Sequence, residues 1–401
     1  MVMILRMVLP VALLCVLVGC SKSEQKVASS PAGAARPEYN SLSDVPAELR
    51  SELESFARQF EADFRSGDSN ALRRAFDGAA IADGICEGVQ GSQKSLSQFK
   101  KGLQEGVTRS ASGQLVQQWS EGDAKYKGLV LYKGSPAARF RFAGQSGVAL
   151  VDMVLRRSAP GQVRVVNFCN HAMGYDLVQQ GRQMVAPMLA DLDKGFLARL
   201  VNKPNISPGD AKRFGDMAKK FASQDYAGVV SLYQGLPPAL RETMPASMMH
   251  INALQNLHED NKYRQALKEA AKRFKFASFQ FMLVDVYYLD KEYDKASECI
   301  DNFMRTLEKD AALLALKSLM LNAKGDIKGA QTVLNEAFKL EPDCIFAHSK
   351  GLDVLLAAKD FAGLRDSMIL LEQKGGYAFK DAMSDPLWDE FKKAPESARW
   401  R

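Results

Sequence analysis

The stretch GDIKGAQTVLNEAFKLEPD, residues 325–343, has the most regular pattern in the chain. Ala330 and Ala337 are seven residues apart, which places both on one face of a helix, and Pro342 would end that helix. Small side chains on one face let a neighbouring helix approach closely, while the flanking apolar residues fill the space beside them. The stretch therefore predicts a helix that packs against at least one other helix.

Three further stretches repeat this outline: NKYRQALKEA at 261–270, KEYDKASECI at 291–300 and KDFAGLRDSM at 359–368. Alignment superposes Tyr263, Tyr293, Ile327 and Phe361, each followed three residues later by Ala266, Ala296, Ala330 and Leu364. The last two intervals are both 34 residues and the first is 30. A period of this length predicts an array of stacked helical pairs.

The period and the small-small-proline spacing resemble the tetratricopeptide (TPR) repeat family. The resemblance implies an all-α, TPR-like solenoid over residues 208–375, with four helical pairs and a fifth, N-terminal pair that includes DYAGVVSLYQGLP at 225–237. Leu364 departs from the family's usual alanine. Residues 376–401 are expected to cap the last repeat through Trp388 and Phe391.

In the TPR family the first helix of each pair lines a concave groove that commonly holds an extended peptide or a helix of another protein. The resemblance implies that a protein or peptide partner would bind there. The expected groove residues are Ile251, Gln255, Phe281, Asp285, Tyr288, Leu319, Asn322, Phe346 and Asp353. For each position the alternative stays open that the side chain faces water or packs between repeats.

Residues 44–190 have a different pattern. Apolar residues at helical spacing over 49–64 predict an amphipathic helix, and from residue 113 onward β-rich runs alternate with Gly-, Ser- and Pro-containing turns. Helices followed by an antiparallel meander predict an α+β domain in which a curved sheet packs on helices. This order resembles the nuclear-transport-factor-2-like (cystatin-like) cone, in which a pocket is common.

Four polar residues are candidates for such a pocket: Asp83, Asp152, Asn167 and His171. A carboxylate and an imidazole together can perform general acid–base chemistry near neutral pH. The competing interpretation is structural: Asp83-Gly84 can form a turn, Asp152 can point outward from its strand, and NFCNHAMG at 167–174 can be a polar strand exit. The structural interpretation is favoured, and catalysis is not expected.

The N-terminal residues MVMILRMVLPVALLCVLVGC have one basic residue, Arg6, and an apolar run too short to span a membrane. The ending LVGC resembles the lipobox of bacterial lipoproteins. The resemblance implies a signal peptide at 1–19 and lipidation of Cys20, which would anchor the chain to the membrane. Ser21 in place of Asp favours the outer membrane, facing the periplasm, over the inner membrane. Residues 20–43 are rich in Ser, Ala and Pro, which predicts a disordered tether.

The formal net charge of +6 over 401 residues is mild, and no block of Lys and Arg indicates a nucleic-acid partner. The folded part would retain Cys86, Cys169, Cys299 and Cys344, whose disulfide pairing the sequence leaves open. There is no phosphate-binding loop, no GxSxG motif and no HExxH motif, so neither a cofactor nor a metal is expected.

Two functions are consistent with these patterns. The favoured one is a lipid-anchored periplasmic scaffold or adaptor that binds a protein through its repeats, in an envelope complex. The alternative is an enzyme or small-ligand binder that uses a pocket in the first domain.

Overall fold

The computed structural model describes residues 38–90, 92–119, 123–144, 147–172, 174–182, 206–275 and 277–400. The expected signal peptide, Cys20 and most of the expected tether lie outside these residues. The chain divides into two compact units. Among the described residues, one unit contains 275–400 together with 143, 144, 147 and 148, and the other contains those of 38–142 and 149–274. Each unit is described by itself.

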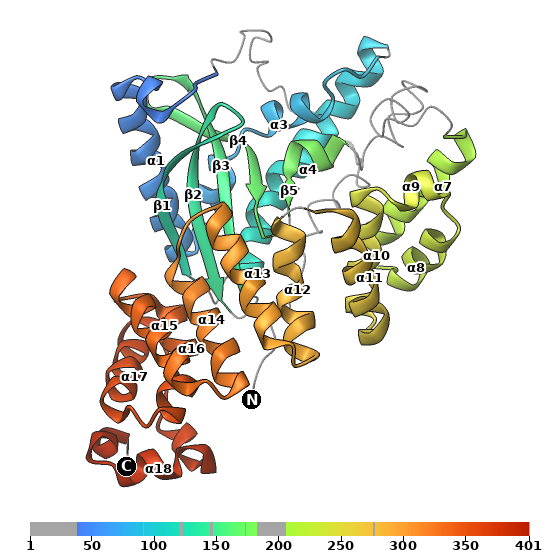
Figure 1. Ribbon diagram of the computed structural model, residues 1–401. Coiled ribbons are helices and arrows are strands. Elements are labelled where there is room, and N and C mark those ends of the chain that lie inside the picture. Colours follow the sequence, from blue (N-terminus) through green and yellow to red (C-terminus); the bar gives the residue numbers. More distant parts are fainter. Residues whose placement is uncertain are drawn as a thin grey trace. The chain divides into compact units, whose positions relative to one another are not determined.

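The N-terminal part combines helices with a mostly antiparallel sheet, which confirms the predicted α+β class (Figure 1). A short 3-10 turn, Leu42–Asp44, precedes four helices and five strands. The helices are α1 (Ala47–Ser66), α2 (Ser69–Ala75), α3 (Gly78–Ile85) and α4 (Gln93–Trp119). The strands are β1 (Asp123–Tyr132), β2 (Ser135–Gly144), β3 (Gly147–Ala159), β4 (Gln162–Asn170) and the short β5 (Tyr175–Asp176), in that spatial order.

Helix α1 packs its apolar stripe against the sheet. The Phe60 ring lies 5.2 Å from that of Phe140, and the Phe64 ring lies 5.2 Å from that of Phe142 in an edge-on arrangement. The helix ends at Gly67, whose φ of 70° is the left-handed conformation that glycine adopts without steric cost. Aromatic residues from β2 therefore fill the space between α1 and one face of the sheet.

The register of β3 and β4 decides which side chains meet on the opposite face. Asp152 pairs with Cys169, and Val154 pairs with Asn167, after which the register shifts between Val154 and Leu155. Cross-strand partners in an antiparallel pair project to the same side, and so does every second residue along each strand. Asp152, Cys169 and His171, two residues after Cys169, are thereby brought to one side of the sheet.

The remainder of the described chain is helical, as predicted. In the unit that contains the sheet, the helices are α7 (Pro208–Ala222), α8 (Tyr226–Gln234), α9 (Pro238–Arg241), α10 (Met244–Asn256) and α11 (Asp260–Arg273). In the other unit they are α12 (Ala277–Leu289), α13 (Tyr293–Thr306), α14 (Ala311–Lys324), α15 (Ile327–Leu340), α16 (Ile345–Ala357) and α17 (Phe361–Gly375). A closing segment contains three 3-10 turns (Asp381–Ser384, Pro386–Trp388 and Pro395–Trp400) and α18 (Asp389–Lys393).

The aligned sequence stretches mark the starts of helices. Tyr293, Ile327 and Phe361 are the first residues of α13, α15 and α17. The Asp326 and Asp360 carboxylates precede two of these helices and accept hydrogen bonds from backbone N–H groups of their first turns, at 2.9 and 3.0 Å. The repeat detected in the sequence is thus a repeat of helix starts.

The aligned alanines of α13 and α15, Ala296 and Ala330, are fully buried, as the packing interpretation requires, whereas Ala266 of α11 is half-buried. Ala330 and Leu334 of α15 belong to one core with Leu364 of α17. Gly351 of α16 lies against Leu334, and a Cβ on this glycine would come within 2.9 Å of a Leu334 methyl group. Trp388, Phe391 and Trp400 of the closing segment join the same core. They bury the apolar face that α17 would otherwise expose.

Candidate functional site

A cluster of paired polar groups lies on the sheet face opposite α1, with Asp152 at its centre. The Arg139 guanidinium donates two hydrogen bonds to the Asp152 carboxylate, from Nε to Oδ1 at 2.7 Å and from Nη2 to Oδ2 at 2.8 Å. The His171 Nε2 lies 2.7 Å from Asp152 Oδ2. Asp152 is only 1% exposed, so this is a buried carboxylate held between two cationic or potentially cationic groups.

The protonation states follow from these contacts. Burial by itself would raise the pKa of Asp152, but the hydrogen bonds and charges of Arg139 and His171 outweigh it and lower the pKa. Burial would lower the pKa of His171, but the hydrogen bond and charge of Asp152 and the contact with Cys169 raise it to about 9. His171 is therefore an imidazolium at neutral pH.

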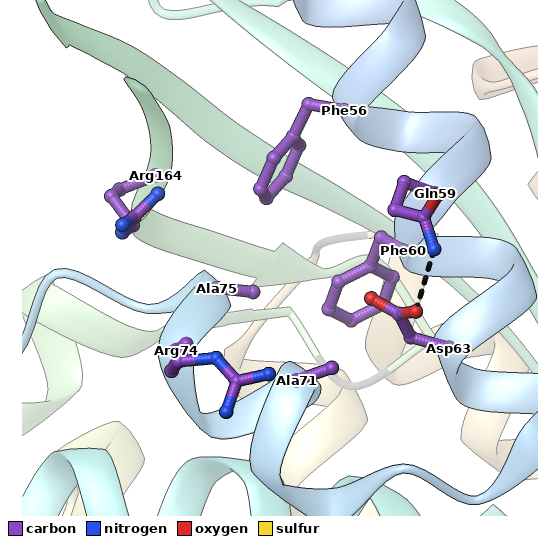
Figure 2. A pocket seen from close by; sticks show the side chains of 8 residues that line it. All are labelled: Phe56, Gln59, Phe60, Asp63, Ala71, Arg74, Ala75 and Arg164. Carbon is purple, nitrogen blue, oxygen red and sulfur yellow. Dashed lines mark hydrogen bonds between the residues drawn. The ribbon is translucent and has the colours of Figure 1, made fainter. Parts of the chain in front are cut away.

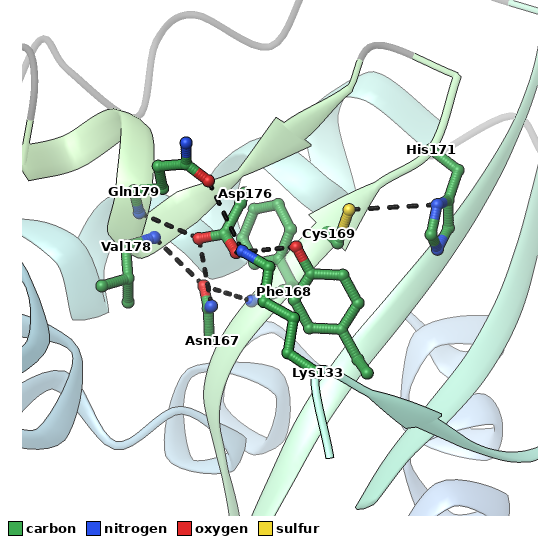
Figure 3. A network of polar contacts seen from close by, with 9 residues as sticks. Lys133, Asn167, Phe168, Cys169, His171, Asp176, Val178 and Gln179 are labelled. Atoms are coloured by element: carbon green, nitrogen blue, oxygen red, sulfur yellow. Dashed lines mark hydrogen bonds and ion pairs between the residues drawn. The ribbon is translucent and has the colours of Figure 1, made fainter. Parts of the chain in front are cut away.

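Cys169 is the third member of this group. Its Sγ lies 3.9 Å from Nδ1 of His171 (Figure 3), whereas the other ring nitrogen, Nε2, contacts Asp152. A thiol, an imidazole and a carboxylate are thus in line, the order in which a nucleophile, a base and an orienting group occur in cysteine-dependent sites. Cys169 is 7% exposed, and the His171 side chain is 19% exposed.

A second paired carboxylate, Asp176 of β5, lies beside the first group. It accepts hydrogen bonds from Tyr132 Oη at 2.7 Å, Lys133 Nζ at 3.1 Å, Asn167 Nδ2 at 3.1 Å and the Gln179 backbone N–H at 2.8 Å (Figure 3). Burial opposes ionisation of Asp176, but these donors lower its pKa. Burial, the main cause, and the neighbouring Cys169 and Asp176 raise the pKa of Tyr132. These donors stabilise the ionised carboxylate of Asp176.

The four predicted pocket residues are only partly brought together. Asp152 and His171 are in contact, and Asn167 belongs to the neighbouring Asp176 group. Asp83 does not join them, because α3 presents it to α4, where it pairs with Lys100 Nζ at 2.7 Å. Asp152 and His171 are thus in contact, whereas Asp83 forms a separate ion pair at the surface.

None of the four lines the depression found in this part of the chain. That depression, of about 210 Å³, lies between α1, α2 and β4 (Figure 2). Phe56 and Phe60 form its apolar side, and Arg74 and Arg164 bring positive charge. Asp63 at its edge already accepts a hydrogen bond from Gln59 at 2.7 Å. The geometry therefore separates the polar cluster from this concave surface.

The predicted groove residues differ widely in exposure. Ile251, Phe281, Asp285 and Phe346 are buried, Gln255, Tyr288, Leu319 and Asn322 are half-buried, and Asp353 is exposed. Phe281 stacks on Phe303 of α13 with ring centroids 4.3 Å apart, so it joins the two helices of one pair and is not available to a partner. Ile251, 1% exposed, is likewise unavailable. Ile251 and Gln255 belong to α10, in the other unit.

Three polar groups on the first helices have no hydrogen-bond partner among the described residues. The Asp285 carboxyl is 6% exposed, and no hydrogen bond to it is found among the described residues. Burial alone raises the pKa of Asp285 well above its usual value, which favours the protonated, neutral form of the carboxyl. Within the same described ranges, Asn322 Oδ1 of α14 is buried without a hydrogen bond, and Gln255 Oε1 of α10 is in the same situation. Each such group costs about 1–3 kcal/mol.

Tyr288 and Asp353 extend this surface. Burial, together with the neighbouring Tyr293 and the negative charge of Asp353, raises the pKa of Tyr288. The Tyr288 ring packs edge-on against that of Tyr293 at 5.7 Å. Helix α14 contacts α16 directly, which places these two first helices beside each other. We call Asp285, Tyr288, Leu319, Asn322 and Asp353 the inner face.

The structure also bears on disulfide bonds, metal binding and membrane-spanning helices. The four described cysteines, Cys86, Cys169, Cys299 and Cys344, are free and buried. Within the described ranges, no three or more His, Cys, Asp or Glu side chains are grouped so that they could hold a metal ion. No helix in the described part of the chain is both long and apolar enough to cross a membrane.

Sequence reasoning missed Arg139, Asp176 and the contact between Cys169 and His171. A signal for Arg139 was present: in ARFRF, residues 138–142, two arginines alternate with apolar residues inside a strand, so both project to one face. Arg141 of this pair is fully buried, and its Nη2 lies 3.4 Å from Asp123 Oδ2.

No family model matches the chain, and no curated protein sequence is significantly similar to it.

Proposed function

We propose that this protein is a lipid-anchored scaffold of the bacterial envelope that binds an extended segment of a protein partner on the inner face. The helical pairs α12/α13, α14/α15 and α16/α17 would form a TPR-like stack, with the first helix of each pair turned to the partner. Cys20 would carry the lipid, and the anchor would hold the protein in the outer membrane, facing the periplasm. The α+β domain, similar in element order to the nuclear-transport-factor-2-like cone, would serve as its companion domain.

The observation that carries the proposal is the pair of unpartnered polar groups on α12 and α14. Asp285 is buried and burial favours the neutral form of its carboxyl, and Asn322 Oδ1 is buried without a donor. Polar groups that remain unsatisfied reduce stability, so their presence indicates a role other than stability. A peptide backbone supplies N–H donors for Asn322 and a C=O acceptor for the proton of neutral Asp285.

The surroundings define the partner further. Tyr288 and Leu319 are half-buried and offer apolar contact area, and Asp353 is exposed and negative. A segment with an apolar side chain opposite Tyr288 and a basic side chain opposite Asp353 would complement this surface.

The substitution Asn322→Leu tests the proposal because it removes an unsatisfied acceptor without removing a contact of the fold. We expect it to preserve or increase stability while abolishing co-purification of the partner from solubilised membranes. Asn335→Leu is the matched control: it makes the same change at an exposed position on the second helix α15 and should leave the partner bound. Retention of the partner by the Asn322→Leu protein at the wild-type level would rule out the inner face as the interface.

The anchor is tested separately by Cys20→Ala. We expect this variant to move from the membrane fraction to the soluble fraction. A variant that stays in the membrane fraction would remove the lipid anchor from the proposal while leaving the inner face untouched.

A further inference from the structure

The alignment of Cys169, His171 and Asp152 sets this cysteine apart from the other three cysteines in the described part of the chain. Asp152 and Cys169 are cross-strand partners on β3 and β4, and His171 follows Cys169 by two residues, so all three project from one side of the sheet. The imidazole connects the other two, with Nε2 2.7 Å from Asp152 Oδ2 and Nδ1 3.9 Å from Cys169 Sγ. The sheet, not a flexible loop, fixes the positions of the thiol and the carboxylate.

Arg139 binds Asp152, at the end of this group opposite Cys169. Its two hydrogen bonds occupy both oxygens of Asp152, at 2.7 and 2.8 Å. An ionised Asp152 in turn keeps His171 protonated, because removing the imidazole proton would leave the buried carboxylate with one cation fewer. A cation next to a sulfur stabilises negative charge that develops on it, and this is the usual environment of a reactive cysteine.

We propose that Cys169 is a reactive thiol that undergoes thiol–disulfide exchange with small disulfides, assisted by the His171 imidazolium that Asp152 holds in place. His171 stabilises the sulfur anion, and Asp152 and Arg139 are positioning residues. The proposal is independent of the inner face.

The reaction balances without any further co-reactant. The Cys169 thiol first releases its proton to water, because His171 is already protonated. The resulting thiolate attacks one sulfur of the disulfide, a new S–S bond forms to Cys169, and the S–S bond of the incoming molecule breaks. The second sulfur departs with the bonding electron pair as a thiolate, and an aliphatic thiolate would take its proton from His171. The small disulfide is the oxidant, and Cys169 becomes half of a mixed disulfide.

The other cysteines provide internal controls. Burial, the main cause, raises the pKa of Cys86 to about 11, although Lys100 and Arg182 oppose it. Burial and Glu298 raise the pKa of Cys299 to about 11. Cys344 is 0% exposed. These three thiols should react slowly in the folded protein, while Cys169 has the imidazolium beside it.

The experiment treats the full-length protein with 5,5′-dithiobis(2-nitrobenzoic acid), an aromatic disulfide, and follows mixed-disulfide formation at each cysteine by peptide mass spectrometry. We expect Cys169 to react at least about tenfold faster than Cys86 or Cys299 at pH 7. The variant His171→Gln should reduce that advantage to about threefold or less. Within this variant, continued slow reaction of Cys86 shows that the α+β domain remains folded.

A pH series tests whether His171, and not the exposure of the thiol alone, makes Cys169 react faster. The ratio of the Cys169 rate to the Cys86 rate should fall as the pH rises past about 9, where His171 loses its proton. The charged or titratable groups that face His171 and Cys169 are Arg139, Asp152, Tyr132, Lys133 and Asp176. None of the carboxylates titrates in this range, because the pKa of Asp152 and that of Asp176 are both lowered.

Two results would overturn the proposal. One is a Cys169 rate no greater than that of the slowest cysteine in the folded protein. The other is a fast Cys169 whose rate is unchanged by His171→Gln and whose advantage does not depend on pH, because exposure alone would then explain it.

Discussion

The α+β domain and the helical repeats each bury an aspartate, and the two aspartates have opposite environments. Asp152, 1% exposed, has Arg139 and His171 as partners, and its pKa is lowered. Asp285, 6% exposed, has no hydrogen-bond partner within the described residues, and its pKa is raised well above the usual value. Burial disfavours the ionised form of both carboxyl groups, so the opposite directions of the two pKa shifts come from the partners. The partnered carboxylate is stabilised as an anion within the sheet, whereas the carboxyl without a partner is a group that the proposed binding segment would satisfy.

The largest expected effect comes from neutralising the satisfied carboxylate. Asp152→Asn leaves the Arg139 and His171 charges buried without their anion, which should destabilise the surrounding sheet by about 3–5 kcal/mol. Peptide-resolved hydrogen exchange of β3 and β4 measures this locally. Exchange at the wild-type rate in the variant would show that the pairing contributes no stability.

An apolar truncation in the repeats gives the next effect. Leu334→Ala creates a cavity against Gly351 and Leu364 and should cost about 2–5 kcal/mol. Urea unfolding followed through the fluorescence of Trp388 and Trp400, which lie in the same core, reports it. The control Val333→Ala, at a half-buried neighbouring position, should cost clearly less. Equal losses would mean that the repeats are not held together by this core.

The pH dependence of the α+β domain should follow His171. Its pKa is raised to about 9 in the folded chain, against 6.5 when unperturbed. The folded state therefore holds the proton more tightly, so the stabilisation is complete below pH 6.5 and is lost as the pH rises toward about 9. Hydrogen exchange of β3 and β4, corrected for intrinsic rates between pH 7 and pH 10, should show this decline. The His171→Gln protein should lack it, and a decline of equal size in that variant would assign the loss to another group.

The smallest effect, of opposite sign, is expected at the unsatisfied carboxyl. Asp285→Asn retains the shape and removes the ionisation, so stability should change by less than about 1 kcal/mol at pH 4. In the wild type, the unfolded chain releases the Asp285 proton above pH 3.8 while the folded chain keeps it, so wild-type stability falls as the pH rises. The variant should therefore be the more stable protein at pH 7, as measured by exchange of α12 amides. Destabilisation at pH 7 would reveal a partner for Asp285 within the chain.

Much of the fold could be predicted because it depends on local pattern. Short stretches of sequence contain both patterns: the apolar stripe that buries Phe60 and Phe64, and the repeat that marks helix starts at Ile327 and Phe361. The spacing of apolar residues shows which of them share a face of a helix or strand. This is enough to predict the secondary structure and the fold class.

The sites were harder to predict because they depend on register and on packing partners. Asp152 and His171 could be suspected from their types, but their contact requires the pairing of Asp152 with Cys169 across two strands. Phe281 was expected in the groove, yet the stack on Phe303 places it inside a helical pair, a choice that period alone does not decide. The missing partner of Asp285 is visible only when all its neighbours are in place.

The most direct test of the account is site-specific photo-crosslinking in cells, with the photoreactive residue placed at Tyr288 and, as a control, at Leu340. Tyr288 lies on the inner face, and Leu340 is 47% exposed at the end of the second helix α15. The account predicts one dominant protein adduct from position 288, lost when Asn322→Leu is added, and no such adduct from position 340. Adducts from position 340 but not 288, or a 288 adduct indifferent to Asn322→Leu, would contradict the assignment of the inner face as the binding surface.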